Sequence, residues 1–284
     1  WRSFHHSAVG PARAGMIRNR DLPTLHKSEI AFSSFTSREN HRQDWRILQR
    51  LYRTDLLKRA FSLMTGSRLG RGQDSYEWLV IASLANTEIF HNEMIGYRYY
   101  LGRGITTFKP MSKQQFAVLS TNYANLIRVA FDYASKFSTF DLMPCVRELH
   151  RRLLEMLFGD WYVRLSDKDK LTTLTDLRDS FTREDIATEL MRLTRDDAYS
   201  HWDAGDVFDV NARYVQWKQI AEELMGASSN KQYELYRSQV LRHFLDLQTR
   251  NSMANRTIRP SSRNLLSIFH PFMPLFRSIK RKNK

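Results

Sequence analysis

The stretch SKQQFAVLSTNYANLIRVA, residues 112–130, indicates the fold class of the chain. Ser112 and Gln115 have the spacing of a capping box, in which each side chain accepts a hydrogen bond from the other residue's backbone N–H. Apolar side chains then recur every three or four residues, which is the period of one helix face: Phe116, Leu119, Tyr123, Leu126, Ile127 and Ala130. The stretch therefore predicts a long amphipathic α-helix.

Similar patterns lie on the N-terminal side of this stretch. One helical stripe comprises Leu48, Tyr52, Leu56, Ala60 and Leu63, and Gly66 is expected to end that helix. Asp74 or Ser75 can cap a second helix, which we expect to continue to about Tyr100.

Further helices are predicted on the C-terminal side. Thr139 is expected to cap a helix that tolerates Pro144 in its first turn and ends at Gly159. Ser166 and Thr182 open two shorter helices. The clearest stripe, ended by Gly226, comprises Val207, Val210, Tyr214, Trp217, Ala221 and Leu224. Ser229 with Gln232 forms another capping box, before a last helix.

No alternating run of β-branched residues competes with these patterns. The sequence predicts an all-α protein, an irregular bundle of about eight helices arranged as helical hairpins. We expect an extended basic N-terminal arm (1–37), an all-helical body (38–254) and a C-terminal tail that is first apolar and then basic (255–284).

Positive charge is concentrated at the two ends. The chain has a formal net charge of +14, and 44 Lys and Arg residues face 30 acids. Residues 1–75 carry 14 cations and 6 acids, and residues 231–284 carry 12 cations and 2 acids, whereas residues 151–230 carry 11 cations and 16 acids. Basic ends on a nearly neutral body are typical of arms that contact RNA, anionic lipid or an acidic protein.

The first twenty residues, WRSFHHSAVGPARAGMIRNR, contain four arginines and no acid. Arg-rich, acid-poor segments with Ala and Ser are typical of mitochondrial transit peptides, so we expect a mitochondrial protein. The alternative is a disordered basic arm on an RNA-bound protein of the cytosol or nucleus. No run reaches the ~20 apolar residues of a membrane-spanning helix, so no span is expected.

The tail LLSIFHPFMPLFRSIKRKNK (265–284) is too short and too rich in proline to span a membrane. Its apolar side chains need cover from another subunit, from the body or from a bilayer surface, and its cations then face an anion. The predicted contact residues are Leu265, Leu266, Ile268, Phe269, Phe272, Met273, Leu275, Phe276, Arg277, Lys280, Arg281, Lys282 and Lys284.

Candidate chemistry is sparse. Glu88 and His91 have the Glu-x-x-His spacing of a di-iron ligand pair on one helix face, but no second copy exists. DDAYSHWDAGDVFD (196–209) is dense in aspartate without the spacing of a calcium loop, which favours caps and a linker over an ion site. Cys145, the single cysteine, is expected to be a buried thiol. We therefore expect no cofactor, no metal and no catalytic activity.

Aromatic residues are abundant, at 12% of the chain. Tyr, Trp and Arg are enriched at protein interfaces, and several rings lie at predicted helix ends or beside charges. The candidate protein-interface residues are Trp45, Tyr99, Tyr100, Trp161 and Trp202.

These features favour a non-catalytic accessory subunit of a large oxidative phosphorylation complex, an ATP synthase or a respiratory complex, on the matrix side of the mitochondrial inner membrane. Its partners would be other protein subunits, with possible contact to anionic lipid. The main alternative is a mitochondrial ribosomal protein that contacts rRNA through its basic arms. A more distant alternative is a metal-dependent helical enzyme that uses Glu88 and His91.

Overall fold

The computed structural model describes residues 23–36, 45–91 and 109–257. These residues form nine α-helices and almost no strand, which confirms the predicted all-α class. The elements in chain order are β1 (Leu25–His26), α1 (Ser28–Phe35), the 3-10 turn η1 (Ile47–Gln49), α2 (Thr54–Leu63), α3 (Gln73–Leu84), β2 (Thr87–Glu88), α4 (Lys113–Lys136), α5 (Met143–Arg164), α6 (Asp167–Asp176), the 3-10 turn η2 (Leu177–Asp179), α7 (Arg183–Asp203), α8 (Arg213–Met225) and α9 (Lys231–Thr257).

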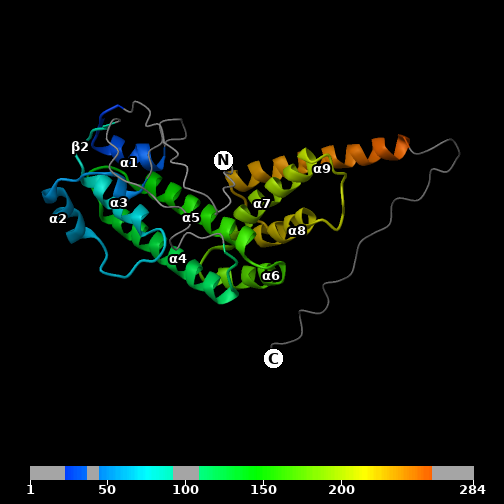
Figure 1. Ribbon diagram of the computed structural model, residues 1–284, viewed down its shortest axis with the longest axis horizontal. Helices are drawn as coiled ribbons and strands as arrows, with labels where there is room; N and C mark the ends of the chain where they lie inside the picture. The colour runs from blue at the N-terminus through cyan, green and yellow to red at the C-terminus, as the bar shows by residue number, and fades with distance from the viewer. Residues whose placement is uncertain (1–22, 37–44, 92–108, 258–284) are drawn as a thin grey trace, which may run out of the picture.

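The helices form two groups along the long axis of the molecule (Figure 1). Helices α1 to α4 lie toward one end, and α7 to α9 lie toward the other, where the end of α9 projects outward. Helix α5 connects the groups, because it packs on α1 and α4 at one side and on α7 at the other. The two short strands pair antiparallel, with Leu25 opposite Glu88.

Several predicted helix ends are confirmed. Ser112 and Gln115 form the capping box of α4, and the Ser112 hydroxyl accepts a hydrogen bond from the Gln115 N–H at 3.2 Å. Ser166 caps α6, and Thr182 caps α7 through a box with Asp185. These starts were readable because a cap and its partner lie within one turn of each other.

Other predicted starts are wrong. Helix α5 begins after Leu142 rather than after Thr139, and it continues through Gly159 to Arg164. Asn230, not Ser229, starts the last helix, since its side-chain oxygen accepts from the Tyr233 N–H at 2.8 Å.

Two predicted stripes extend too far toward their N-terminal ends. Leu48 is exposed and lies in η1, so the first stripe becomes helical only at Thr54. Val207 and Val210 are exposed and precede α8, which starts after Ala212 and ends at Gly226 as expected.

Helix α3 begins after Gly72, not after Asp74 or Ser75, and ends at Leu84 rather than near Tyr100. Gly72 has φ 93°, a left-handed conformation that favours glycine. A Cβ at this position would lie 3.3 Å from both the Leu153 and Tyr123 side chains. The start of α3 is thus fixed by its close approach to α4 and α5.

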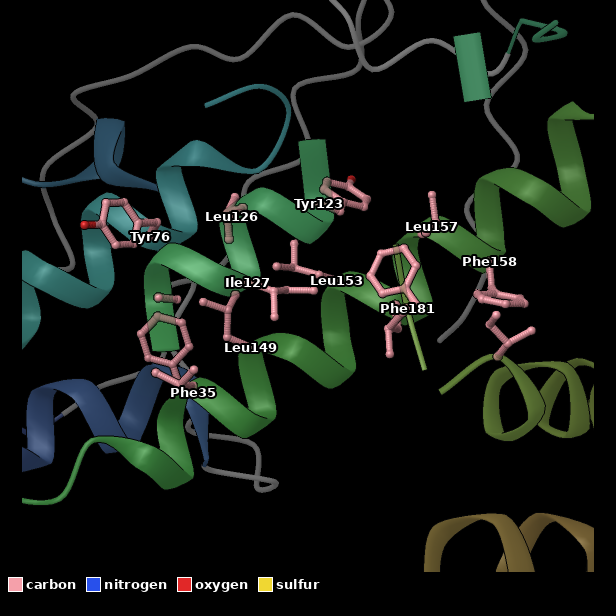
Figure 2. Close-up of a cluster of buried hydrophobic side chains, with 14 of the residues drawn as sticks. Phe35, Tyr76, Tyr123, Leu126, Ile127, Leu149, Leu153, Leu157, Phe158 and Phe181 are labelled. Atoms are coloured by element: carbon pink, nitrogen blue, oxygen red, sulfur yellow. The ribbon is translucent and has the colours of Figure 1, made fainter. Parts of the chain in front are cut away.

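The main core lies between α1, α3, α4, α5 and α7 (Figure 2). Every predicted inward residue of α4 is buried within it, including Phe116, Tyr123 and Leu126. Leu149, Leu153 and Leu157 of α5 pack in the same cluster, so α5 is the central element.

Helix α1 lies inside the range predicted as an extended arm, yet it belongs to the body. Ile30, Ala31 and Phe35 are fully buried. The Arg152 guanidinium donates to the carbonyls of Ser34 and Phe35 at 3.1 and 2.8 Å. These carbonyls lie in the last turn of α1, where they have no partner within the helix. The described part of the arm therefore starts to pack at β1 and α1.

Candidate functional site

The predicted interface residues have different positions. Trp45 is partly buried against the core. The centroid of its ring lies 6.1 Å from that of the Phe35 ring and 5.0 Å from the Arg152 guanidinium. Trp202 is partly exposed near the C-terminal end of α7. Tyr99 and Tyr100, like all the predicted tail residues from Leu265 to Lys284, lie outside the described residues.

Trp161 is a core residue rather than a surface residue. Its side chain is fully buried, and the indole N–H donates to the Lys170 carbonyl and the Thr173 hydroxyl at 3.1 and 3.0 Å. The Trp217 ring packs on it at 5.3 Å. Trp161 joins α5 to α6 and α8 within the chain, so its ring packs inside the protein and not at the predicted interface.

The helical geometry assumed for a metal at Glu88 and His91 is wrong. Glu88 lies in β2, and helix α3 ends before it, so the two side chains do not share a helix face. Glu88 instead accepts from Arg50 at 2.8 Å. In residues 23–36, 45–91 and 109–257, no group of three or more His, Cys, Asp or Glu side chains is arranged to hold a metal ion.

The aspartate-rich stretch was expected to be a linker with caps, but its first half, through Asp203, is helical. Several of its carboxylates have protein partners. Asp196 accepts from Arg192 and Arg195, and Asp206 pairs with His201 at 2.7 Å.

Asp197 is the buried centre of a junction between helices. Arg213 of α8 donates to Asp197 at 2.7 Å, and the Tyr162 hydroxyl of α5 donates to the same carboxylate at 3.3 Å. The Arg213 guanidinium also lies 4.9 Å from the Trp217 ring centroid. A buried charge needs such pairing, and the junction serves to fix α8 against α5 and α7.

Cys145 has the expected surroundings. It is fully buried, and burial raises the pKa of its thiol to about 12, with a smaller contribution from the Asp141 carboxylate. A thiol that stays protonated is a poor nucleophile, so its role in the described structure is packing.

A candidate for ligand or partner contact is a surface shared by α7 and α9, which we call the α7–α9 face. It surrounds an open hollow of about 360 Å³. The hollow is lined by Arg195, Asp196, Tyr199, Gln239, Arg242 and His243. Trp202 lies next to it, against the His243 ring.

Three rings are grouped on this face. The Tyr199 ring lies 5.6 Å from the Trp202 ring and 5.5 Å from the His243 ring, and the Tyr199 side chain is 47% exposed. Arg250 covers Trp202, with its guanidinium 5.4 Å from the ring centroid. Tyr199 and Trp202 are three residues apart, which places both on one side of α7.

His243 and Arg242 give the hollow its polar character. Burial lowers the pKa of His243 from its usual value, which favours the neutral ring, and its Nδ1 has no hydrogen-bond partner in the described structure. Arg242 is exposed at the edge, whereas Arg195 is paired with Asp196. Protein interfaces are enriched in aromatic rings and arginine, and an unpaired ring nitrogen such as His243 Nδ1 can hydrogen-bond to a partner.

Sequence reasoning found Trp202 but missed Tyr199, Arg242 and His243. The Tyr-x-x-Trp spacing was a usable signal for Tyr199, because it predicts two rings on one helix side. His243 and Arg242 come from a helix more than forty residues later, and nothing in the sequence indicates that α9 packs on α7 at this position.

None of the described helices combines the length and the apolar composition that crossing a membrane requires, in line with the expectation of no span. No protein-family model matches the chain, and neither a curated protein nor a solved structure shows significant similarity to it.

Proposed function

We propose that the chain is a non-catalytic accessory subunit of a large oxidative phosphorylation complex, an ATP synthase or a respiratory complex, on the matrix side of the mitochondrial inner membrane. The observation that carries the proposal is the α7–α9 face, where Tyr199, Trp202 and His243 are grouped beside Arg242 at an open hollow. Rings and arginine in a partly desolvated hollow are the commonest anchors of protein–protein binding.

The outward side of α9 supports the same proposal. Leu241 and Leu245 lie one helical turn apart, and both are exposed. Two adjacent exposed leucines on the last described helix, which the apolar tail follows in sequence, favour cover by another subunit.

The mitochondrial compartment is supported by the Arg-rich, acid-poor first twenty residues, and the membrane side by the apolar tail with its five cations. In this proposal, the α7–α9 face binds a neighbouring subunit, while the tail contacts either that subunit or anionic lipid.

Gradient sedimentation of gently solubilised mitochondria tests the proposal. We expect the chain to migrate with a respiratory or ATP synthase complex, before and after ribonuclease treatment. Removal of residues 265–284 should release it, whereas added salt alone should not, because apolar burial is insensitive to screening. A free, light chain under all conditions would contradict the proposal.

The second candidate is a mitochondrial ribosomal protein, which the net charge of +14 and the excess of Arg, 32 of 44 cations, favour. RNA contact through the arms would make binding fall steeply with salt. Migration with ribosome-sized particles that ribonuclease abolishes would support this candidate over the first.

A further inference from the structure

A second exposed surface lies at the opposite end of the molecule from α9. Residues 46–68, comprising η1, α2 and the turns around them, are called the α2 corner, and α2 lies at the end of the long axis in Figure 1. Leu51 is 90% exposed, Leu48 65% and Phe61 59%. Helix α2 buries only Ala60 completely, where it packs on α3. Large exposed apolar side chains grouped in one segment mark a contact surface.

The same corner is strongly basic. Six cations and one acid, Asp55, lie between residues 46 and 68. Arg50 pairs with Glu88, which lies outside this segment. Arg53, Lys58 and Arg68 are exposed, and the surface pair between Arg53 and Asp55 is open to solvent on both sides. Lys58 lies one turn before Phe61 on the same side of α2, so a cation and a ring face outward together.

The side chains exposed at the corner favour a lipid surface as the partner, because large apolar groups and cations lie in one short segment. A basic helix with exposed apolar residues binds the interface of an anionic bilayer, where apolar burial and attraction to lipid phosphates act together.

We propose that the α2 corner lies on the surface of an anionic lipid bilayer, with Leu48, Leu51 and Phe61 in the headgroup region and Arg53, Lys58 and Arg68 at the phosphates. The proposal rests on the proposed function for the presence of such a membrane. It uses none of the residues of the α7–α9 face or of the tail, so each can fail without the other.

A site-specific fluorophore tests this contact in the full chain. Ser62→Cys places a label on the exposed side of α2, and Thr172→Cys places a matched label on the exposed side of α6. The fully buried Cys145 is protected from the label. On vesicles of phosphatidylcholine with phosphatidylglycerol, we expect a blue shift at position 62 and none at position 172.

Charge and apolar variants then separate the two contributions. Arg53→Gln with Lys58→Gln and Arg68→Gln should weaken vesicle binding by at least about tenfold, since each cation near an anionic surface adds attraction. The control Arg128→Gln with Lys168→Gln and Arg178→Gln removes three exposed cations elsewhere and should weaken binding far less. Leu51→Ser with Phe61→Ser should abolish the blue shift.

Three results would overturn the proposal. The first is vesicle binding without a blue shift at position 62, which would assign the contact to another part of the chain. The second is an equal shift on phosphatidylcholine alone. The third is a shift without vesicles that grows with protein concentration, which would assign the corner to contact between copies. None of these results would overturn the proposed function, because co-migration with the complex through the α7–α9 face is measured in a separate experiment.

Discussion

The centre of the molecule and its α7–α9 end contain the same residue types but use them differently. In the centre, Trp161 is fully buried, and its N–H is satisfied by α6. At the α7–α9 end, Trp202 is only partly covered, and the second core cluster contains just three buried residues: Ala198, Tyr214 and Leu247. An abundance of rings therefore does not identify an interface. The interface candidates are the rings that the fold leaves uncovered.

The largest expected effect concerns the two cores themselves. Leu153→Ala removes a fully buried side chain from the crowded main core and should lower the free energy of unfolding by about 3–5 kcal/mol. Leu247→Ala, in the small cluster, should cost about 2–3 kcal/mol, because the neighbouring rings can partly close the space. Urea denaturation measures both, with the exposed Leu171→Ala as the control. Equal losses would contradict the distinction between the two regions.

The next effect concerns the attachment of α1 to the centre. Arg152→Met leaves the carbonyls of Ser34 and Phe35 without their donor, and should cost about 2–3 kcal/mol. Amide hydrogen exchange in α1 should accelerate more than exchange in α8.

The control for this variant is Arg151→Met, on the same helix. Arg151 is more exposed, and it donates to the carboxylates of Glu148 and Glu155 rather than to α1. Partly exposed pairs contribute about 0–1 kcal/mol, so exchange in α1 should barely change. Similar exchange in both variants would mean that Arg152 does not hold α1.

A helix start can be predicted from the sequence when the residues that fix it lie close together in the chain. The start of α4 is set by Ser112 and Gln115, three residues apart, and it was predicted correctly. The start of α3 is set by the approach of Gly72 to Leu153, a contact across more than eighty residues, and it was predicted wrongly. Helix stripes were overextended at Leu48 and Val207, because an apolar residue at helical spacing can also lie in an exposed turn.

The candidate site was only half readable for the same reason. Trp202 was selected by composition, and Tyr199 shares its helix side, but His243 reaches them only because α9 packs on α7. The Arg213–Asp197 pair likewise joins α8 to α7. Charge and ring type indicate what kind of contact a residue can make, whereas the packing of distant helices determines which residue makes it.

A smaller effect, dependent on pH, separates the buried part of α7 from its exposed part. Burial raises the pKa of Glu189 to about 7, although Arg192 donates to it at 2.8 Å. The folded protein therefore holds a proton that the unfolded chain releases between about pH 4.5 and 7. The stability contributed by this group is present at low pH and is lost as pH rises through that window.

Glu189→Gln should remove this dependence. When the pH is raised from about 5 to about 8, the free energy of unfolding of the variant should rise relative to that of the wild type by about 1 kcal/mol or more. Urea denaturation at both pH values measures the difference. Glu184→Gln, at an exposed position on the same helix, should follow the wild-type profile. Parallel profiles for all three proteins would show that Glu189 titrates normally in the fold.

The smallest effect on stability should accompany the largest effect on assembly. Tyr199→Ala removes a half-exposed ring from the α7–α9 face and should change the free energy of unfolding by no more than about 1 kcal/mol. If Tyr199 anchors a partner subunit, the variant should nevertheless leave the complex in the sedimentation gradient, because anchoring rings contribute about 2 kcal/mol or more to binding. Val163→Ala, which is also exposed but lies on α5, should stay with the complex. Release of both variants, or of neither, would contradict the assignment of this face, since exposure alone would then predict nothing about assembly.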